Sequence, residues 1–226
     1  MISPAHLLVD LDDTLYAYAP SAEAAEAAAF AEAARELDWT PSSVARAYAD
    51  ARDAVKGRLG QRAAAHARLL YFHELVHRAG RVDLLASVRR WDRRYWSAFL
   101  AGATLRPFAL ELLSGVAKRG GKVAVVTDLV LEVQLWKLEH FGLMPYVHAL
   151  VASEEVPEDK PRPEIFQLAL HRIGDVPPAS CVMVGDHEEK DGGGARALGI
   201  RYFRVDTGNG QGESLEAIAH QLGVAP

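Results

Sequence analysis

The stretch that decides the fold is Leu7-Leu8-Val9 followed directly by Asp10-Leu11-Asp12-Asp13-Thr14. The three apolar residues are typical of a buried strand in a parallel sheet, and the acidic cluster stands where that strand would end. Open α/β sheets bind their ligands at the carboxyl ends of their strands. This stretch therefore predicts a strand that carries polar chemistry at the ligand-binding edge of a sheet.

Four later apolar runs predict further strands, at residues 123–126, 147–151, 181–184 and 202–205. Helices are expected around them over residues 107–120, 129–141, 163–173 and 195–198, and several of these helices are closed by glycine. Strands that alternate with helices indicate a doubly wound parallel sheet. The sequence therefore predicts an α/β fold with a Rossmann-like core.

The segment from residue 16 to residue 103 shows no convincing strand. Its Ala- and Glu-rich part from Ser21 to Leu37 favours a helix, with Ser21 as a candidate N-cap, and Thr40-Pro41 opens a second helix. A third and a fourth helix are expected over about 61–79 and 82–100. We therefore predict two domains: an α/β core of residues 1–15 and 104–226, and an all-helical insertion of residues 16–103.

Composition sets bounds on the class of protein. The chain has 226 residues, a formal net charge of -5 and 50% hydrophobic residues, which is typical of a globular protein. This acidity argues against nucleic acid or an anionic membrane as a partner. Cys181 is the only cysteine, so an internal disulfide and a thiolate zinc cluster are excluded, and a reducing compartment such as the cytoplasm is expected. The first residues do not resemble a secretory signal, and no stretch is long and apolar enough to span a bilayer.

Polar residues also follow three of the later runs. They are Thr127 and Asp128, then Lys160-Pro161, then Gly185-Asp186 with Asp191 five residues beyond. Asp10, Asp12 and Asp186 are expected to converge, with Lys160 as the nearby cation. Two like charges about 4 Å apart repel by about 4 kcal/mol at an effective dielectric near 20, so this cluster requires a divalent cation. Hard oxygen ligands without Cys or His favour Mg²⁺ over Zn²⁺.

A magnesium ion beside a free carboxylate makes a site for phosphoryl transfer. In such a site the Thr127 hydroxyl can donate a hydrogen bond to phosphate. Lys160 can offset the negative charge that develops in the transition state. The expected ligand is therefore a small-molecule phosphate ester.

These residues resemble the motifs of the haloacid dehalogenase (HAD) superfamily. The four motifs in order are D-x-D-x-T at residues 10–14, Thr at 127, Lys-Pro at 160–161 and G-D-x-x-x-x-D at 185–191. Subsidiary similarities include Gln134 to Leu138, Phe141-Gly142-Leu143 and Pro163-Glu164-Ile165-Phe166. The order, the spacing and the strand-end placement carry the resemblance, which runs from Asp10 to about Val205. The helical insertion has the position of the family's C1-type cap.

The resemblance implies a role for each motif residue. Asp10 would be the nucleophile that forms an aspartyl-phosphate, and Asp12 the general acid and base. Asp10, the backbone carbonyl of Asp12 and Asp186 would hold Mg²⁺, with Asp191 in the outer shell. Lys160 would be catalytic and, with Thr127 and Asp128, would bind the substrate phosphate. The implied activity is Mg²⁺-dependent hydrolysis of a small soluble phosphorylated metabolite, such as a nucleoside monophosphate or a sugar phosphate.

Two positions bear on which branch of the superfamily this is. The 2-haloacid dehalogenases lack an acidic residue at the place of Asp12, because halide leaves without a proton, so Asp12 favours a phosphatase over that alternative. Asp128 stands where the family usually has Asn or a small residue, and Leu129 stands where Gly often follows. A carboxylate beside phosphate is repulsive unless it is paired or turned away, and Asp128 is then expected to offer its backbone N–H.

A second motif competes with this interpretation. His73-Glu74-Leu75-Val76-His77 has the H-E-x-x-H pattern, in which two histidines on one helix face bind zinc and the glutamate acts as base in a metalloprotease. The alternative is an amphipathic helix of the insertion with histidines beside its apolar stripe. The zinc interpretation leaves the strand-end acids unexplained. Phospho-acceptor receiver modules share the acids, Thr and Lys, but they are shorter and lack an inserted helical segment.

Overall fold

The structure is a computed structural model that describes residues 6–225. It contains two compact units. One is formed by the segments up to Ala17 and from Thr104 onward, and the other by Tyr18–Ala103. We call them the α/β unit and the helical unit. The chain passes between them two residues after the boundary that the sequence predicts on the N-terminal side.

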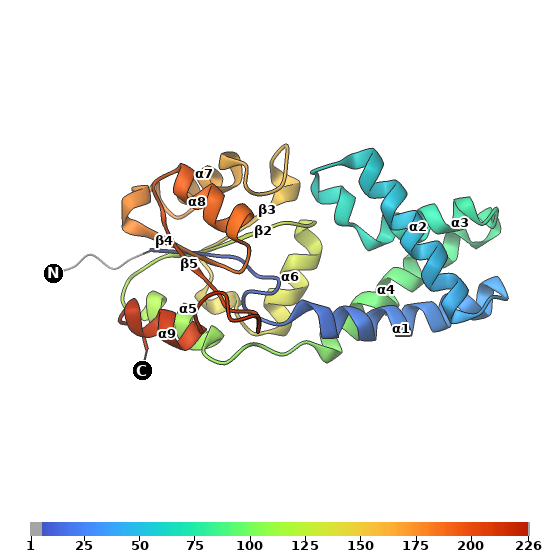
Figure 1. Cartoon of the computed structure of the whole chain (residues 1–226), viewed down its shortest axis with the longest axis horizontal. Coiled ribbons are helices and arrows are strands. Elements are labelled where there is room, and N and C mark those ends of the chain that lie inside the picture. Colours follow the sequence, from blue (N-terminus) through green and yellow to red (C-terminus); the bar gives the residue numbers. More distant parts are fainter. Residues whose placement is uncertain (1–5, 226) are drawn as a thin grey trace. The chain divides into compact units, whose positions relative to one another are not determined.

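The α/β unit is built on a five-stranded parallel sheet in the order β3-β2-β1-β4-β5 (Figure 1). The strands are β1 His6–Val9, β2 Val123–Thr127, β3 Ala149–Ala152, β4 Cys181–Gly185 and β5 Arg201–Arg204. Leu8 in the central strand pairs with Ala124 of β2 and with Met183 of β4. The predicted α/β fold is therefore confirmed, and β1 carries its acidic cluster to the middle of the sheet.

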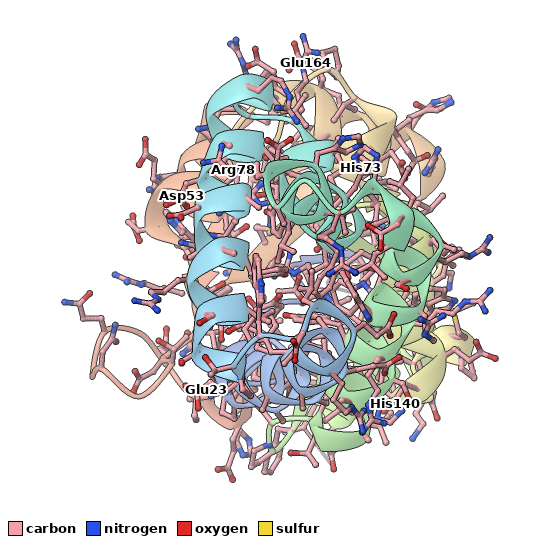
Figure 2. All side chains as sticks on the ribbon, turned by 90° about the vertical axis from the view of Figure 1, so that its right-hand side faces the viewer. Glu23, Asp53, His73, Arg78, His140 and Glu164 are labelled. Carbon is pink, nitrogen blue, oxygen red and sulfur yellow. The ribbon has the colours of Figure 1, made fainter. Side chains whose placement is uncertain are left out.

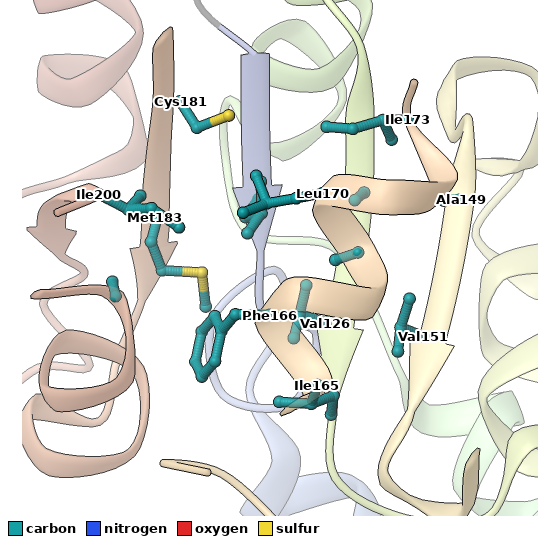
Figure 3. Packing of buried hydrophobic residues seen from close by; sticks show 14 residues of the cluster. Val126, Ala149, Val151, Ile165, Phe166, Leu170, Ile173, Cys181, Met183 and Ile200 are labelled. Atoms are coloured by element: carbon teal, nitrogen blue, oxygen red, sulfur yellow. The ribbon is translucent and has the colours of Figure 1, made fainter. Parts of the chain in front are cut away.

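Helices cover both faces of this sheet. They are α5 Ala109–Lys118, α6 Leu131–His140, α7 Pro163–Arg172, α8 Gly194–Ala197 and α9 Leu215–Gln221. Helices α7 and α8 lie on one face, and α5 and α9 lie on the other (Figure 1). Ile165, Phe166 and Leu170 of α7 face the strands and pack with Val126 and Met183 (Figure 3). Burial of these apolar faces on both sides explains why the strands read as continuous hydrophobic runs.

Some boundaries in the α/β unit differ from the predicted ones. Strand β3 begins two residues later than expected, because Met144–Tyr146 forms a 3₁₀ turn before it. A π-helical turn at Glu188–Gly193 precedes α8. Helix α9 is not predicted by the sequence analysis. Its N-cap is Ser214, whose hydroxyl accepts a hydrogen bond from the Ala217 N–H at 3.1 Å.

The helical unit contains α1 Tyr18–Leu37, α2 Pro41–Leu59, α3 Arg68–Arg78 and α4 Leu85–Gly102. Helix α1 packs against α2 and α4, and α3 packs against α2 and α4. Aromatic side chains fill the space between these helices, with Phe72 in contact with Tyr48 and Trp91. Charged side chains such as Glu23, Asp53 and Arg78 extend outward from the same helices (Figure 2).

Two predictions for this unit need correction. Ser21 is not an N-cap, because α1 begins earlier, at Tyr18, and encloses Ser21 as a buried residue. The third helix is shorter than expected and the fourth begins later, since 3₁₀ turns at Ala63–His66 and Val82–Leu84 precede α3 and α4. Thr40-Pro41 opens α2 as predicted, and Thr40 is its N-cap, accepting from the Ser43 N–H at 3.2 Å. None of the helices within residues 6–225 combines the length and apolar character that crossing a membrane requires.

Candidate functional site

The polar segments predicted to meet at one edge of the sheet do meet there. Asp10 follows β1, Thr127 ends β2, and Asp186 follows β4. Because β1 lies between β2 and β4, these three residues come from adjacent strand ends. Lys160 reaches the same place from the segment after β3. The topology alone therefore accounts for their convergence.

A buried lysine links two of the acids. The Lys160 ammonium donates to Asp10 Oδ1 and to Asp191 Oδ1, each at 2.7 Å, and to the Val126 carbonyl at 3.1 Å. Only 3% of Lys160 is exposed. Burial works against its charge, but Asp10 and Asp191 outweigh burial and raise the pKa of Lys160 well above its usual value. Lys160 is therefore a fixed cation beside the Asp10 carboxylate.

Three carboxylates form a cluster suited to a hard cation. Oxygens of Asp10, Asp186 and Asp191 all lie within 4.8 Å of one another. Burial, together with the neighbouring carboxylates, raises the pKa of Asp10 well above its ordinary value despite the opposing effect of Lys160. Burial and then Asp191 also raise the pKa of Asp186. Burial and mutual repulsion thus both oppose the charge on these carboxylates, and the all-oxygen donor set fits Mg²⁺.

Thr14 ties this cluster together. Its hydroxyl lies 3.0 Å from Asp10 Oδ2 and 3.2 Å from Asp186 Oδ1, within donating distance of both, and it accepts from the Asp186 N–H at 3.0 Å. Thr14 is fully buried. Its placement orients two acids from distant segments, since Thr14 itself is 172 residues from Asp186.

The Asp12 side chain is held apart from the carboxylate cluster. Lys137 of α6 donates to its two oxygens at 2.6 and 2.9 Å, Gln134 donates to Oδ2 at 3.3 Å, and the Tyr16 hydroxyl also donates to it. Burial would raise the pKa of Asp12, but the charge and hydrogen bonds of Lys137, with those of Tyr16 and Gln134, lower it. The side chain is thus a carboxylate with fixed orientation. The backbone carbonyl of Asp12 is the group that remains for a cation, as the resemblance implies.

Asp128 is paired, which was one of the two outcomes expected for a carboxylate at this position. Its Oδ1 accepts from the Lys160 N–H at 3.0 Å and its Oδ2 lies 2.8 Å from the Lys190 ammonium. Its backbone carbonyl accepts from Thr127 Oγ1 at 3.2 Å. The next residue, Leu129, has φ of 106°, a conformation that favours glycine, and its N–H donates to Ser153 Oγ at 3.1 Å. The turn therefore keeps a strained non-glycine residue.

Sequence reasoning missed the roles of Lys137, Gln134 and Lys190. A lysine on a helix usually indicates a solvated face, whereas Lys137 is completely buried. The Gln134 amide bridges Asp12, Thr127 Oγ1 at 2.8 Å and the Asp128 carbonyl at 2.7 Å. A signal was present, because Gln134 and Lys137 are three residues apart on one helix and lie within the stretch that resembles the superfamily.

The competing histidine motif lies in the helical unit. The ring nitrogens of His73 and His77 are 3.2 Å apart on an exposed face of α3. Glu74, the base that a metalloprotease would need, pairs instead with Arg58 at 3.2 Å. Among the residues that the structure describes, Asp10, Asp186 and Asp191 form the one cluster of metal-ligating side chains. Within residues 6–225 the histidine pair therefore has no third ligand of the kind that a catalytic zinc site needs.

Known proteins resemble the chain over most of its length. A family model described as haloacid dehalogenase-like hydrolase matches residues 5–199. A ribulose-1,5-bisphosphate 5-phosphatase of Halopiger xanaduensis is 39% identical over 202 residues, which cover 88% of this chain and 84% of that protein. A glyceraldehyde 3-phosphate phosphatase of Methanopyrus kandleri is 31% identical over 218 residues, which cover 91% and 85%.

Solved structures give the same result. A HAD phosphatase from Thermococcus onnurineus superposes with a TM-score of 0.71 at 21% identity, covering 98% of this chain and 99% of that one. A 2-haloacid dehalogenase from Pseudomonas syringae has a TM-score of 0.69 at 28% identity, covering 90% and 86%. The resemblance seen in the sequence motifs is confirmed: the chain belongs to the haloacid dehalogenase-like hydrolases.

Proposed function

We propose that this hydrolase cleaves small phosphate monoesters, with Asp10 as the nucleophile that forms an aspartyl-phosphate. The observation that carries the proposal is the buried Asp10 carboxylate, 2.7 Å from Lys160 and clustered with Asp186 and Asp191. Asp10, Asp186 and the Asp12 carbonyl would hold Mg²⁺, with Asp191 beside them. The bound ion would neutralise phosphate oxygens and so allow a carboxylate to approach phosphorus.

Each remaining residue has a part in this proposal. Thr127, the Asp128 backbone N–H and Lys160 bind the transferred phosphate, and Lys160 offsets charge in the transition state. Asp12 takes up a proton before the reaction and gives it to the leaving oxygen, and the resulting carboxylate then takes a proton from the water that hydrolyses the acyl-phosphate. Lys137 and Gln134 hold the Asp12 carboxylate in place for both steps.

We propose a phosphorylated sugar as the substrate, since the two relatives named above are phosphatases of ribulose 1,5-bisphosphate and glyceraldehyde 3-phosphate. The nucleoside monophosphates that the motif string also suggests belong in the same screen. A reducing, cytoplasmic setting suits the single cysteine, Cys181.

Phosphate release from p-nitrophenyl phosphate and from a panel of sugar phosphates tests the proposal. We expect turnover that requires Mg²⁺ and falls by about 10³-fold or more in Asp10→Asn, because the nucleophile is lost. Asp175→Asn is the matched control, since Asp175 is an exposed aspartate that pairs with His171 and does not belong to the cluster. No turnover on any ester, or full activity in Asp10→Asn, would contradict the proposal.

Two further readouts separate the other candidates. His73→Ala should keep full activity, and the reverse pattern, loss in His73→Ala with activity in Asp10→Asn, would favour the metalloprotease. The structural likeness to a 2-haloacid dehalogenase makes chloride release worth measuring. Chloride release from 2-chloropropionate without phosphate hydrolysis would favour that activity, although a dehalogenase has no use for an acid at Asp12.

A further inference from the structure

The helical unit contains a cavity of its own. Its volume is about 190 Å³, and all the residues that line it come from α1 to α4 and the 3₁₀ turn before α3. It shares no residue with the carboxylate cluster of the α/β unit. A cavity of this size accommodates a small metabolite rather than a polymer.

Positive charge dominates the lining. The lining has three cations, Arg52 and Lys56 of α2 and Arg68 of α3, and one carboxylate, Glu26 of α1, a formal balance of +2. Outside the lining, the exposed Asp53 pairs with Arg52 at 3.1 Å. Burial raises the pKa of Glu26, with Arg68 and Arg52 opposing that effect. A carboxyl group that takes up a proton more readily opposes an incoming anion less. The lining therefore favours an anionic ligand.

Arg68 is the most firmly held of these cations. Its Nη1 donates to the His66 carbonyl at 2.6 Å and its Nη2 donates to the Tyr18 hydroxyl. Its guanidinium carbon lies 5.5–5.9 Å from the centres of four aromatic rings, those of Tyr18, Tyr71, Tyr95 and Trp96. The carbonyl and the phenol fix its position without neutralising its charge. A guanidinium carries five N–H donors, so donors remain beyond its bonds to His66, Tyr18 and Tyr95, and guanidinium groups bind phosphate well.

The rest of the lining suits hydroxyl groups. Tyr48, Tyr71 and Tyr95 also line the cavity, and a phenol both donates and accepts hydrogen bonds. Glu26 offers carboxyl oxygens beside them. We propose that this cavity is a binding site for a small hydroxylated phosphate ester, with Arg68, Arg52 and Lys56 on its phosphate and the phenols and Glu26 on its hydroxyl groups.

Calorimetric titration of the full chain tests this site directly. The titration is done in EDTA, which prevents turnover and leaves the carboxylate cluster repulsive to anions. Inorganic phosphate and glycerol 3-phosphate are the probes, and glycerol is the uncharged control. We expect one site for glycerol 3-phosphate, weaker binding of phosphate, no binding of glycerol, and weakening by added salt. A wild-type chain that binds neither probe would overturn the proposal.

Variants locate the site. Arg68→Lys and Arg52→Gln should each weaken binding by at least tenfold. Arg52 and Lys56 are exposed at the rim, so Arg52→Gln and Lys56→Gln remain informative if Arg68→Lys does not fold. Arg46→Gln is the matched control, because Arg46 is an exposed arginine of the same helix outside the lining, and it should change binding less than twofold. Equal weakening by Arg46→Gln, or none by Arg52→Gln and Lys56→Gln, would refute the assignment.

Asp10→Asn separates this inference from the proposed activity, since the variant should lose turnover and keep the calorimetric site. The phosphate ester has two possible sources, and kinetics distinguish them. A rise in KM in Arg52→Gln for a bisphosphate but not for a monophosphate would assign the bound group to the substrate, an assignment that rests on the proposed function. A change in the rate on p-nitrophenyl phosphate when glycerol 3-phosphate is added, absent in Arg52→Gln, would assign it to a separate regulatory molecule.

Discussion

Lys137→Met removes the cation that holds Asp12. Lys137 is fully buried, its ammonium lies 2.6 and 2.9 Å from the two Asp12 oxygens, and the Asp12 side chain is 26% exposed. Breaking a buried ion pair costs about 3–5 kcal/mol, because it leaves a charge without its partner. The partial exposure of Asp12 lets water replace some of the lost interaction, so we expect about 3 kcal/mol. For a chain of this length that lowers Tm by roughly 6–12 °C.

The assay is thermal unfolding of four proteins at pH 7 without Mg²⁺: wild type, Lys137→Met, Asp12→Asn and the double variant. Asp12→Asn should be at least as destabilising as Lys137→Met, because it removes the carboxylate that pairs with a fully buried ammonium. The double variant should lose less stability than the two single variants lose together, by about 1 kcal/mol or more, because the two groups contact each other. Lys118→Met, on the exposed face of α5, is the control and should change stability by less than about 0.5 kcal/mol.

Unchanged stability in Lys137→Met would refute the reasoning, because it would mean that the pair contributes nothing. Strict additivity of the two single losses would do the same, since the coupling is what the geometry predicts.

Three other predictions concern separate parts of the molecule. Mg²⁺ should stabilise the folded chain by about 2.7 kcal/mol at a concentration of 100 times Kd, and so raise Tm. Asp186→Asn should remove this rise in Tm, and Asp175→Asn should keep it. An equal rise in both variants would place the ion elsewhere. Burial would raise the pKa of Glu36, but hydrogen bonds from Arg90, Ser87 and Trp91 lower it below 4.5. The stability that the Glu36 carboxylate contributes is therefore fully present above pH 4.5 and is lost as the pH falls through the pKa of the folded state. Glu36→Gln should therefore lower Tm at pH 7 by roughly 2–4 °C, equivalent to about 1 kcal/mol, and the difference should shrink below pH 4.5; a constant difference in a pH series would count against it. Gly194→Ala should destabilise by about 1–3 kcal/mol in urea titration, because its Cβ would lie 2.2 Å from the Phe166 ring, whereas Gly193→Ala, which meets nothing within 4 Å, should be neutral or slightly stabilising; similar losses in both would contradict the packing.

The sheet and the acidic edge were predictable for a shared reason. A strand buried on both faces must be apolar along its whole length, so Leu7-Leu8-Val9 and Val123–Val126 stand out against their surroundings. Parallel topology then brings the residues at their ends together. The convergence of Asp10, Thr127, Lys160 and Asp186 thus follows from the order of the strands.

What could not be predicted depends on contacts between distant segments. Lys137 has the sequence context of a solvated helical lysine, and only the assembled α/β unit buries it against Asp12, 125 residues away in the sequence. The pairing of Asp128 with Lys190 joins residues 62 positions apart. The cavity around Arg68 likewise needs the four helices assembled, since Tyr18 and Arg68 are 50 residues apart. Local propensity carries no information about such pairs.

The order of the strands also bears on how the chain is made. Strand β1 is the centre of the sheet, yet both of its partners are translated only after the whole helical unit: Leu7 pairs with Val123, 116 residues later, and His6 with Cys181, 175 residues later. At about 5–20 residues per second, the nascent β1 waits roughly 6–23 s before its first neighbour leaves the ribosome tunnel. During that interval the helical segment, which forms a compact unit of its own, is free to fold first. We therefore expect the inserted helical unit to fold before the sheet whose strands flank it in the sequence.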